Sequence, residues 1–129
     1  MTGNKCFLDT SVIIHVFKDN KTIVKALKTF DEVYISSIAV GELYFGAYAS
    51  TNLTKHLKQV HVFLADCTIV PLGLNTSVVY GKLKAELKKA GTPIPENDIW
   101  IAAMALENEL PLFTTDNHFK LTKVDLITI

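Results

Sequence analysis

The sequence predicts an α/β fold with a central five-stranded parallel sheet. Short apolar segments alternate along the chain with longer segments in which apolar residues recur every three to four positions. A chain of 129 residues with 49% apolar residues can build a sizeable core, and we expect one domain over residues 1–129. No internal repeat or linker interrupts the alternation. Such alternation is typical of a parallel sheet with helices on both faces, which gives three α/β/α layers.

The first part of the chain holds two predicted strands and three predicted helices. The strands are the apolar runs 5–8 and 33–35. The helices follow from helical spacing between breakers and cover residues 12–18, 22–30 and 36–48. Ser36 or Ser37 is a suitable N-cap for the third helix, because its hydroxyl can accept a hydrogen bond from a free backbone N–H group.

The second part of the chain continues the alternation. Predicted helices, which have apolar residues on one face, cover residues 53–65, 75–90 and 97–108, and predicted strands cover 68–72, 112–114 and 124–129. Asn75 is the expected N-cap of the fifth helix, and Gly91 is expected to end it. The connector 92–95 contains two prolines, after which Asn97 or Asp98 is expected to cap the last helix.

Glu42 is the residue that packing alone explains least well. The predicted helix 36–48 is apolar almost all round, which is typical of a buried helix. No Lys or Arg lies three or four positions from Glu42 to pair with it. A buried, unpaired carboxylate is costly, so Glu42 must be hydrated, protonated, paired with a distant residue or bound to a metal ion.

Four acidic residues are expected at one edge of the sheet. Asp9 follows the first strand, Glu42 lies one turn into the helix after the second, Asp98 begins the last helix and Asp116 follows the fourth strand. Ligands of parallel α/β sheets bind beyond the carboxyl ends of the strands, near the point where the strand order reverses. If the first strand is central, all four carboxylates can face one pocket.

Each acid also has an ordinary structural explanation. Asp9 and Asp98 can serve as helix caps, and Asp116 can stabilise the turn 115–117. Glu42 has neither a cap position nor a local partner. Four acids at the same end of one sheet are much harder to attribute to coincidence than any one of them.

The expected chemistry of such a group is metal-assisted phosphoryl transfer. Two carboxylates about 5 Å apart repel by roughly 3 kcal/mol at an effective dielectric of about 20, so four cannot all stay ionised unaided. Oxygen ligands without a thiolate suit Mg²⁺ or Mn²⁺. A metal in an acidic pocket typically binds phosphate oxygens and activates water.

Other catalytic classes find little support. The sequence has no dinucleotide-binding glycine motif, no P-loop, no His-Glu-x-x-His motif and no Cys-x-x-Cys pair. An aspartyl nucleophile of the haloacid-dehalogenase type needs a second Asp two positions after Asp9, where Ser11 stands, and a receiver domain needs an acidic pair there. Of the four histidines, His118 lies nearest to the four candidate acids in the sequence, and it is a candidate for binding phosphate.

The charges are unevenly distributed although they sum to zero. Residues 53–93 hold six lysines and two acids, net +4, whereas residues 94–118 hold five acids and no lysine. All 13 basic residues are Lys, which excludes an arginine finger in cis. Lys82, Lys84, Lys88 and Lys89 are candidates for contacting a phosphate backbone, and a solvated helix face is an equally good explanation.

Composition also bounds location and partners. No apolar run approaches the roughly 20 residues of a membrane span, and the N-terminus leads directly into a strand, so we expect neither a membrane segment nor a signal peptide. Cys6 and Cys67 are expected to be buried free thiols of a cytoplasmic protein. Apolar side chains on the first and third helices cannot all face the core and are candidates for a partner surface or for core packing: Ile13, Ile14, Phe17, Tyr44 and Tyr48.

The four acidic segments together resemble the PIN domain family, and more closely its VapC-type toxins. The matching segments, in family order and spacing along the whole chain, are Phe7-Leu8-Asp9-Thr10-Ser11-Val12, Val40-Gly41-Glu42-Leu43, Asn97-Asp98-Ile99-Trp100-Ile101-Ala102-Ala103 and Thr114-Thr115-Asp116-Asn117-His118-Phe119. Each motif is short and degenerate, but the four together are fairly specific.

The resemblance implies a Mg²⁺- or Mn²⁺-dependent endoribonuclease that cuts tRNA or rRNA. It implies metal-binding acids at Asp9, Glu42, Asp98 and Asp116, with Glu42 also orienting the attacking water. It further implies supporting hydroxyls at Thr10 or Ser11 and at Thr114 or Thr115. A homodimer and a cognate antitoxin are the implied partners. The alternatives are a PIN-like module that binds RNA or protein without cutting, and a metal-dependent phosphatase for small esters.

Overall fold

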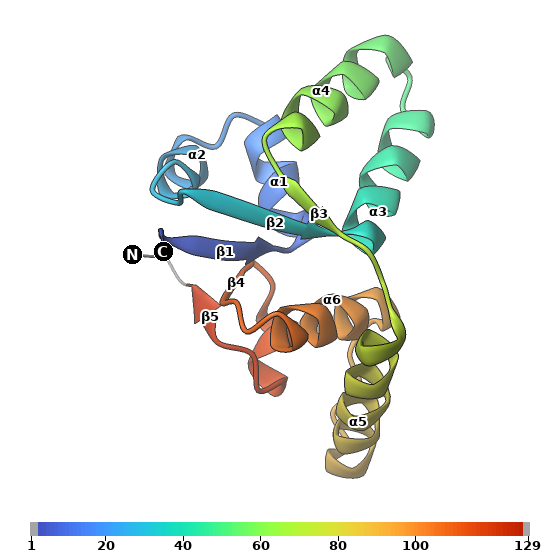
Figure 1. Ribbon diagram of the computed structural model, residues 1–129. Helices are drawn as coiled ribbons and strands as arrows, with labels where there is room; N and C mark the ends of the chain where they lie inside the picture. Colours follow the sequence, from blue (N-terminus) through green and yellow to red (C-terminus); the bar gives the residue numbers. More distant parts are fainter. Residues whose placement is uncertain (1–2, 128–129) are drawn as a thin grey trace.

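The computed structural model describes residues 3–127 and contains a five-stranded sheet in the order β3-β2-β1-β4-β5 (Figure 1). All four pairs of neighbouring strands are parallel. The predicted α/β fold with a central parallel sheet is therefore confirmed, and β1 occupies the central position on which the convergence of the acids depends. The extent of the domain, 1–129, stays a prediction.

The elements follow the predicted alternation. The strands are β1 (Lys5–Leu8), β2 (Glu32–Ser36), β3 (Thr68–Val70), β4 (Leu112–Phe113) and β5 (Leu126–Ile127). The helices are α1 (Thr10–Phe17), α2 (Lys21–Leu27), α3 (Ser37–Tyr48), α4 (Leu53–Ala65), α5 (Leu74–Ala90) and α6 (Glu96–Glu107). A 3₁₀ helix, η1 (Asn117–Leu121), follows β4 and was not predicted.

The core forms around the central strand. Cys6, Phe7 and Leu8 of β1 are fully buried, because β2 and β4 cover both edges of the strand and helices cover its faces. Helix α6 contributes an uninterrupted buried segment from Ile101 to Ala105. These two elements hold the carboxyl end of β1 and the start of α6 in fixed positions, which matters because both carry acids.

Several boundaries differ from the predicted ones. Helix α6 begins at Glu96 with Pro95 at the N-cap, so Asp98 lies within its first turn and is not a cap. Helix α5 begins at Leu74, and its C-terminus is closed by Gly91 in the left-handed conformation (φ 68°), as predicted. The last predicted strand is shorter than expected, since β5 begins at Leu126, and residues 128–129 lie outside the described residues.

The prediction that the helix 36–48 is buried all round is wrong. Ala39, Leu43 and Ala47 of α3 are buried along one face, whereas Phe45 and Tyr48 are 75% and 65% exposed. Helices α3 and α4 pack against each other and project from one end of the sheet (Figure 1). This arm buries only one face of α3, which is why an apolar helix is half exposed.

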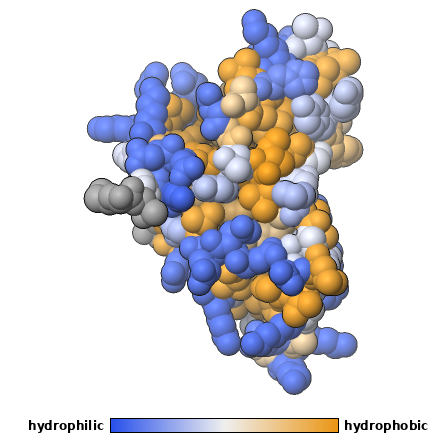
Figure 2. All heavy atoms as spheres, viewed as in Figure 1, coloured by the Kyte–Doolittle hydropathy of each residue, from blue (hydrophilic) through white to orange (hydrophobic). Residues whose placement is uncertain are grey.

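Apolar side chains gather on one side of the molecule. Figure 2 shows an almost continuous orange band from the α3–α4 arm at the top to α5 at the lower right. Of the partner-surface candidates, Ile14 and Tyr48 are exposed, Phe17 and Tyr44 pack partly against the core, and Ile13 is fully buried, so its assignment to a surface is wrong. The other large exposed apolar residues are Phe45, Leu53, Val62, Ile69, Leu72, Leu74, Val78 and Leu121.

Both cysteines are free thiols. Cys6 is buried and Cys67 is only partly buried. Burial raises the pKa of the Cys6 thiol and raises that of Cys67 to about 11, so both stay protonated at neutral pH. Within residues 3–127, no helix combines the length and the apolar character needed to cross a membrane.

Glu109, in the turn between α6 and β4, has a left-handed backbone (φ 53°) that a β-carbon disfavours. We expect Glu109→Gly to raise the free energy of unfolding by about 0.5–1 kcal/mol, since glycine adopts this conformation without steric cost. Ala85→Gly on the exposed side of α5 is the control and should lower it by about 1 kcal/mol. Denaturant titration measures both; destabilisation by Glu109→Gly would contradict the assignment of strain.

Candidate metal centre at the carboxyl edge of the sheet

The acids predicted to form the site lie on four elements that meet at one edge of the sheet. Asp9 is the first residue after β1, Glu42 lies in the second turn of α3, Asp98 lies in the first turn of α6 and Asp116 follows β4. The Asp9 N–H donates to the Phe113 carbonyl of the neighbouring strand at 3.0 Å, which ties the ends of β1 and β4 together. Parallel pairing thus brings Asp9 and Asp116 to the same edge although 107 positions separate them.

Asp9 is buried and is held by two hydroxyl groups. Its side chain is 2% exposed. The Ser11 and Thr114 hydroxyls both donate to its Oδ2 atom, at 2.7 and 2.8 Å. These bonds fix the carboxylate while supplying no positive charge.

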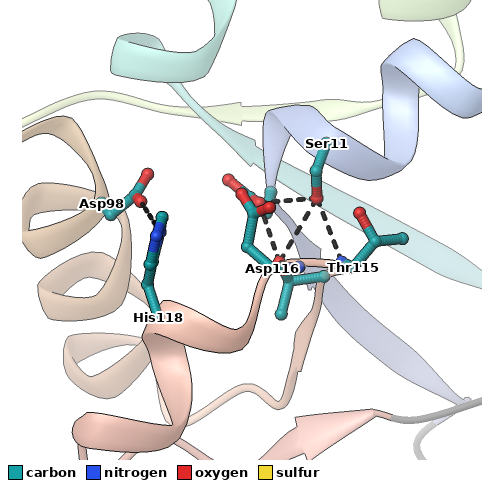
Figure 3. A network of polar contacts seen from close by, with 7 residues as sticks. Ser11, Asp98, Thr115, Asp116 and His118 are labelled. Atoms are coloured by element: carbon teal, nitrogen blue, oxygen red, sulfur yellow. Dashed lines mark hydrogen bonds and ion pairs between the residues drawn. The ribbon is translucent and has the colours of Figure 1, made fainter. Parts of the chain in front are cut away.

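The same hydroxyls shape the segment that carries Asp116. The Thr115 N–H donates to Ser11 Oγ at 3.1 Å, and the Asp116 N–H donates to Thr114 Oγ1 at 3.0 Å (Figure 3). Three of the predicted supporting residues therefore take part: Ser11 and Thr114 through their hydroxyls and Thr115 through its backbone. The network joins the start of α1 to the turn after β4.

Glu42 is partly exposed to solvent and is bonded to a hydroxyl from a distant part of the chain. It is half buried, and its Oε1 atom accepts a hydrogen bond of 2.6 Å from Thr10 Oγ1. No lysine forms an ion pair with it within the described part of the chain. Thr10, the fourth predicted supporting residue, thus links Glu42 to the residue next to Asp9.

Asp98, Asp116 and His118 form the tightest cluster at this edge. One ligand atom from each residue lies within 4.8 Å of the other two. His118 Nδ1 is 3.1 Å from Asp98 Oδ2, and Figure 3 shows the two side chains pointing toward each other from η1 and α6. His118, predicted to bind substrate phosphate, is thus in contact with a predicted metal-binding acid.

The electrostatics indicate that three of the acids are within reach of one another. Burial raises the pKa of Asp9, the hydrogen bonds from Ser11 and Thr114 act in the opposite direction, and the charge of Asp116 adds to the rise. Burial also raises the pKa of Asp98; the His118 hydrogen bond lowers it, and the charges of Asp9 and Asp116 raise it. In both cases the ionised form is disfavoured.

This set of donors fits a hard divalent cation. Asp9, Asp98 and Asp116 supply carboxylate oxygens, and within residues 3–127 neither Asp9 nor Asp116 forms an ion pair with a lysine. Oxygen ligands and uncompensated negative charge are the features that Mg²⁺ and Mn²⁺ require. Glu42 and Asp9 are not part of the 4.8 Å cluster, but the charge of Asp9 still raises the pKa of Asp98.

The four predicted substrate-binding lysines all lie on the exposed side of α5. Lys84 is already engaged: its ammonium forms an ion pair with Glu96 at 3.0 Å and donates to the Tyr80 hydroxyl. Lys82, Lys88 and Lys89 form no ion pair among the described residues.

A set of contacts between α5 and α6 next to the site was not predicted from the sequence. The rings of Tyr80 and Trp100 are stacked 3.6 Å apart, and the Tyr80 hydroxyl donates to Glu96. Together with Lys84 these contacts attach the first turn of α6, which carries Asp98, to α5. The sequence signal was only the helical spacing of Tyr80 and Lys84.

Comparison with known proteins gives a consistent picture. The family model described as "PIN domain" matches residues 6–124. The chain is 35% identical over 116 residues to "Ribonuclease VapC2" of Haemophilus influenzae, covering 87% of this chain and 86% of the relative.

Solved structures of the same kind share the fold. The VapBC complex of Salmonella typhimurium bound to DNA matches with a TM-score of 0.88 and 26% identity, over 97% of both chains. VapBC-1 of nontypeable Haemophilus influenzae matches with a TM-score of 0.82 and 29% identity, over 91% of both chains. Each similarity spans nearly the whole chain.

In the metal-free protein, we expect the contribution of Asp9 to stability to fall as pH rises above the ordinary carboxyl pKa of about 4. The folded protein holds the Asp9 proton more tightly than the unfolded chain, so the free energy of unfolding decreases as pH rises from that value through the raised folded-state pKa. Asp9→Asn removes this titration, so its stability relative to the unmodified protein should improve as pH rises above about 4.

Thermal unfolding in chelator, measured at several pH values, tests this expectation. Asp125→Asn changes an exposed acid and is the control, whose curve should run parallel to that of the unmodified protein. A curve for Asp9→Asn that is also parallel would show that Asp9 ionises without cost. If the substitution only weakened the hydrogen bonds to residue 9, the plot of stability against pH for Asp9→Asn would shift up or down without a change in slope.

Proposed function

The chain belongs to the PIN domain family and, within it, to the VapC ribonucleases, and we propose that it hydrolyses RNA phosphodiester bonds with a divalent metal ion. The observation that carries this proposal is the set of three carboxylates whose charges act on one another, one of them on a residue that is 2% exposed, with no lysine ion pair to any of them within residues 3–127. A bound Mg²⁺ or Mn²⁺ supplies that charge, polarises the phosphate and favours the deprotonation of water.

In this proposal the aspartates bind the metal ion and Glu42 orients the attacking water. Asp98 and Asp116 each bring a carboxylate oxygen into the 4.8 Å cluster, and Asp9 adds a buried carboxylate. Glu42 accepts the Thr10 hydrogen bond through Oε1, which leaves Oε2 free to orient the attacking water and to accept its proton. Attack by water on phosphorus then breaks the P–O3′ bond without a covalent enzyme intermediate.

The hydroxyl network has a positioning role in this proposal. Ser11 and Thr114 hold Asp9 through one carboxylate oxygen, so the other is available to a metal ion. Because the Thr114 hydroxyl also accepts a hydrogen bond from the Asp116 N–H, it fixes the positions of Asp9 and Asp116 relative to each other. The groups are held by β1, β4 and α6, which are rigid parts of the core.

The relatives suggest the biological context. The solved relatives are VapBC complexes, some of them bound to DNA. We infer that this chain is likewise the toxin of a toxin–antitoxin pair, that it binds a cognate antitoxin, and that it forms a homodimer. Ile14, Phe45 and Tyr48, which are exposed on α1 and the α3–α4 arm, are suited to contact such a protein partner.

Asp116→Asn should reduce RNA cleavage by at least about 100-fold, because it removes a metal-binding oxygen while leaving the side chain the same size. The assay uses chelator-treated protein, structured RNA such as tRNA or an rRNA fragment, and added Mg²⁺ or Mn²⁺. Asp125→Asn is the control and should cleave at the normal rate. The circular dichroism spectrum should be the same for all three proteins.

Three results of this assay would contradict the proposal. The first is undiminished cleavage by Asp116→Asn in a preparation free of contaminating nuclease. The second is turnover of a small ester such as p-nitrophenyl phosphate without any cleavage of RNA, which would identify a phosphatase. Binding of RNA without cleavage at any metal concentration would identify a non-catalytic module.

Lys88 and Lys89, in the last turn of α5, should contact the RNA backbone. Replacing both by alanine should raise KM and leave kcat unchanged. It should also reduce the slope of log KM against log salt by about 0.7 for each phosphate that is no longer neutralised. Lys25→Ala with Lys28→Ala on α2 is the matched control. An unchanged slope in the α5 variant would assign these lysines to an ordinary solvated surface.

A further inference from the structure

His118 lies where a ligand of the metal ion would lie. Its imidazole, Asp98 and Asp116 are the three residues that meet within 4.8 Å in the described part of the chain. They come from α6, from the turn after β4 and from η1, so the cluster depends on the fold and is not a local feature of one segment. Figure 3 shows the imidazole beside the Asp98 carboxylate, on the side that faces Asp116.

The spacing within the cluster suits coordination of a single ion. Two neighbouring ligands on an octahedral ion with bonds of about 2.1 Å lie about 3 Å apart. His118 Nδ1 and Asp98 Oδ2 are 3.1 Å apart. The spacing of the two atoms therefore suits binding to one ion after a small rotation of the imidazole, and the hydrogen bond between them is the contact that the ion would replace.

The position of His118 is fixed by its neighbours. Phe119, the next residue, is fully buried and anchors η1 in the core, while the His118 side chain remains about half exposed. Asp116, two residues earlier, is held through its backbone by Thr114. An imidazole restrained in this way loses little conformational freedom when it binds a metal ion.

We propose that His118 is a direct ligand of the metal ion held by Asp98 and Asp116, and that its nitrogen makes this centre select Mn²⁺ and later first-row ions over Mg²⁺. Carboxylate oxygens bind Mg²⁺ and Mn²⁺ alike, whereas imidazole nitrogen favours transition metals. Mg²⁺ prefers an octahedral shell of oxygen atoms and gives up its water reluctantly. The proposal rests on the metal-dependent function proposed above.

Metal binding measured without RNA tests this selectivity. Isothermal titration of the chelator-treated protein with MnCl₂ and with MgCl₂ gives the two dissociation constants. His118→Asn, which replaces the nitrogen ligand by an amide, should weaken Mn²⁺ binding at least about 10-fold and change Mg²⁺ binding much less. His61→Asn on the exposed side of α4 is the control and should change neither.

Pulsed electron paramagnetic resonance of the Mn²⁺-loaded protein tests the bond itself. We expect a ¹⁴N hyperfine coupling from the imidazole in the unmodified protein and its loss in His118→Asn. Absence of the coupling, or equal weakening of Mn²⁺ and Mg²⁺ binding by the substitution, would overturn the proposal, because His118 would then act only through its hydrogen bond to Asp98.

These outcomes are separable from those of the proposed function. A protein that cleaves RNA but shows no ¹⁴N coupling keeps its function and loses this inference. A protein that shows the coupling and the Mn²⁺ preference but cleaves no RNA keeps the metal site and loses the ribonuclease assignment. Failure of Mn²⁺ alone to bind would overturn this inference, and failure of both Mn²⁺ and Mg²⁺ would also overturn the proposed function.

Discussion

The repulsion between carboxylates at one edge of the sheet is the constraint on which the structure of the site depends. Burial raises the cost of ionising Asp9 and Asp98, the charge of Asp116 adds to that cost at Asp9, and the charges of Asp9 and Asp116 add to it at Asp98. Within residues 3–127 the lysine ion pairs join other acids: Asp19, Glu32, Glu86 and Glu96. Among the described residues, lysines pair with acids elsewhere in the chain but not with these. The carboxyl edge of the sheet therefore keeps an excess of negative charge that a bound cation can neutralise.

The fold sustains this cost because neutral groups hold the acids in place. Hydroxyls of Ser11 and Thr114 bind Asp9, and the Thr10 hydroxyl binds Glu42, so no acid needs a lysine to be oriented. The central position of β1 places Asp9 where the strand order reverses, which is the usual ligand site of parallel α/β sheets. Free energy from the core of β1 and α6 offsets the destabilisation at the edge, an arrangement common at functional sites.

The sequence was sufficient for the fold and for the meeting of the acids. Alternating segments predicted the parallel sheet, and the carboxyl-end rule brought Asp9, Asp98 and Asp116 together because it depends on topology and not on side-chain detail. The exposure of α3 was not predictable, since an apolar helix that buries one face has the same composition as one buried on all sides. Phe45 and Tyr48 are exposed only because the arm projects from the sheet.

Pairings between side chains were also beyond the sequence. The hydroxyls of Ser11 and Thr114 are 103 positions apart and meet only after β1 and β4 pair. The contact of His118 with Asp98 depends on the 3₁₀ helix η1, for which residues 117–121 carry no clear signal. Such contacts follow from the fold, whereas helical spacing and capping preferences report only on neighbours in the chain.

Anomalous diffraction from crystals soaked in Mn²⁺ and recorded near the manganese absorption edge measures most directly whether these acids share a cation. Our account requires an anomalous peak within bonding distance of carboxylate oxygens from Asp98 and Asp116, with Asp9 facing it. If crystals soaked in saturating Mn²⁺ showed no anomalous peak at this edge of the sheet, or showed peaks only at other acids, the result would contradict our account.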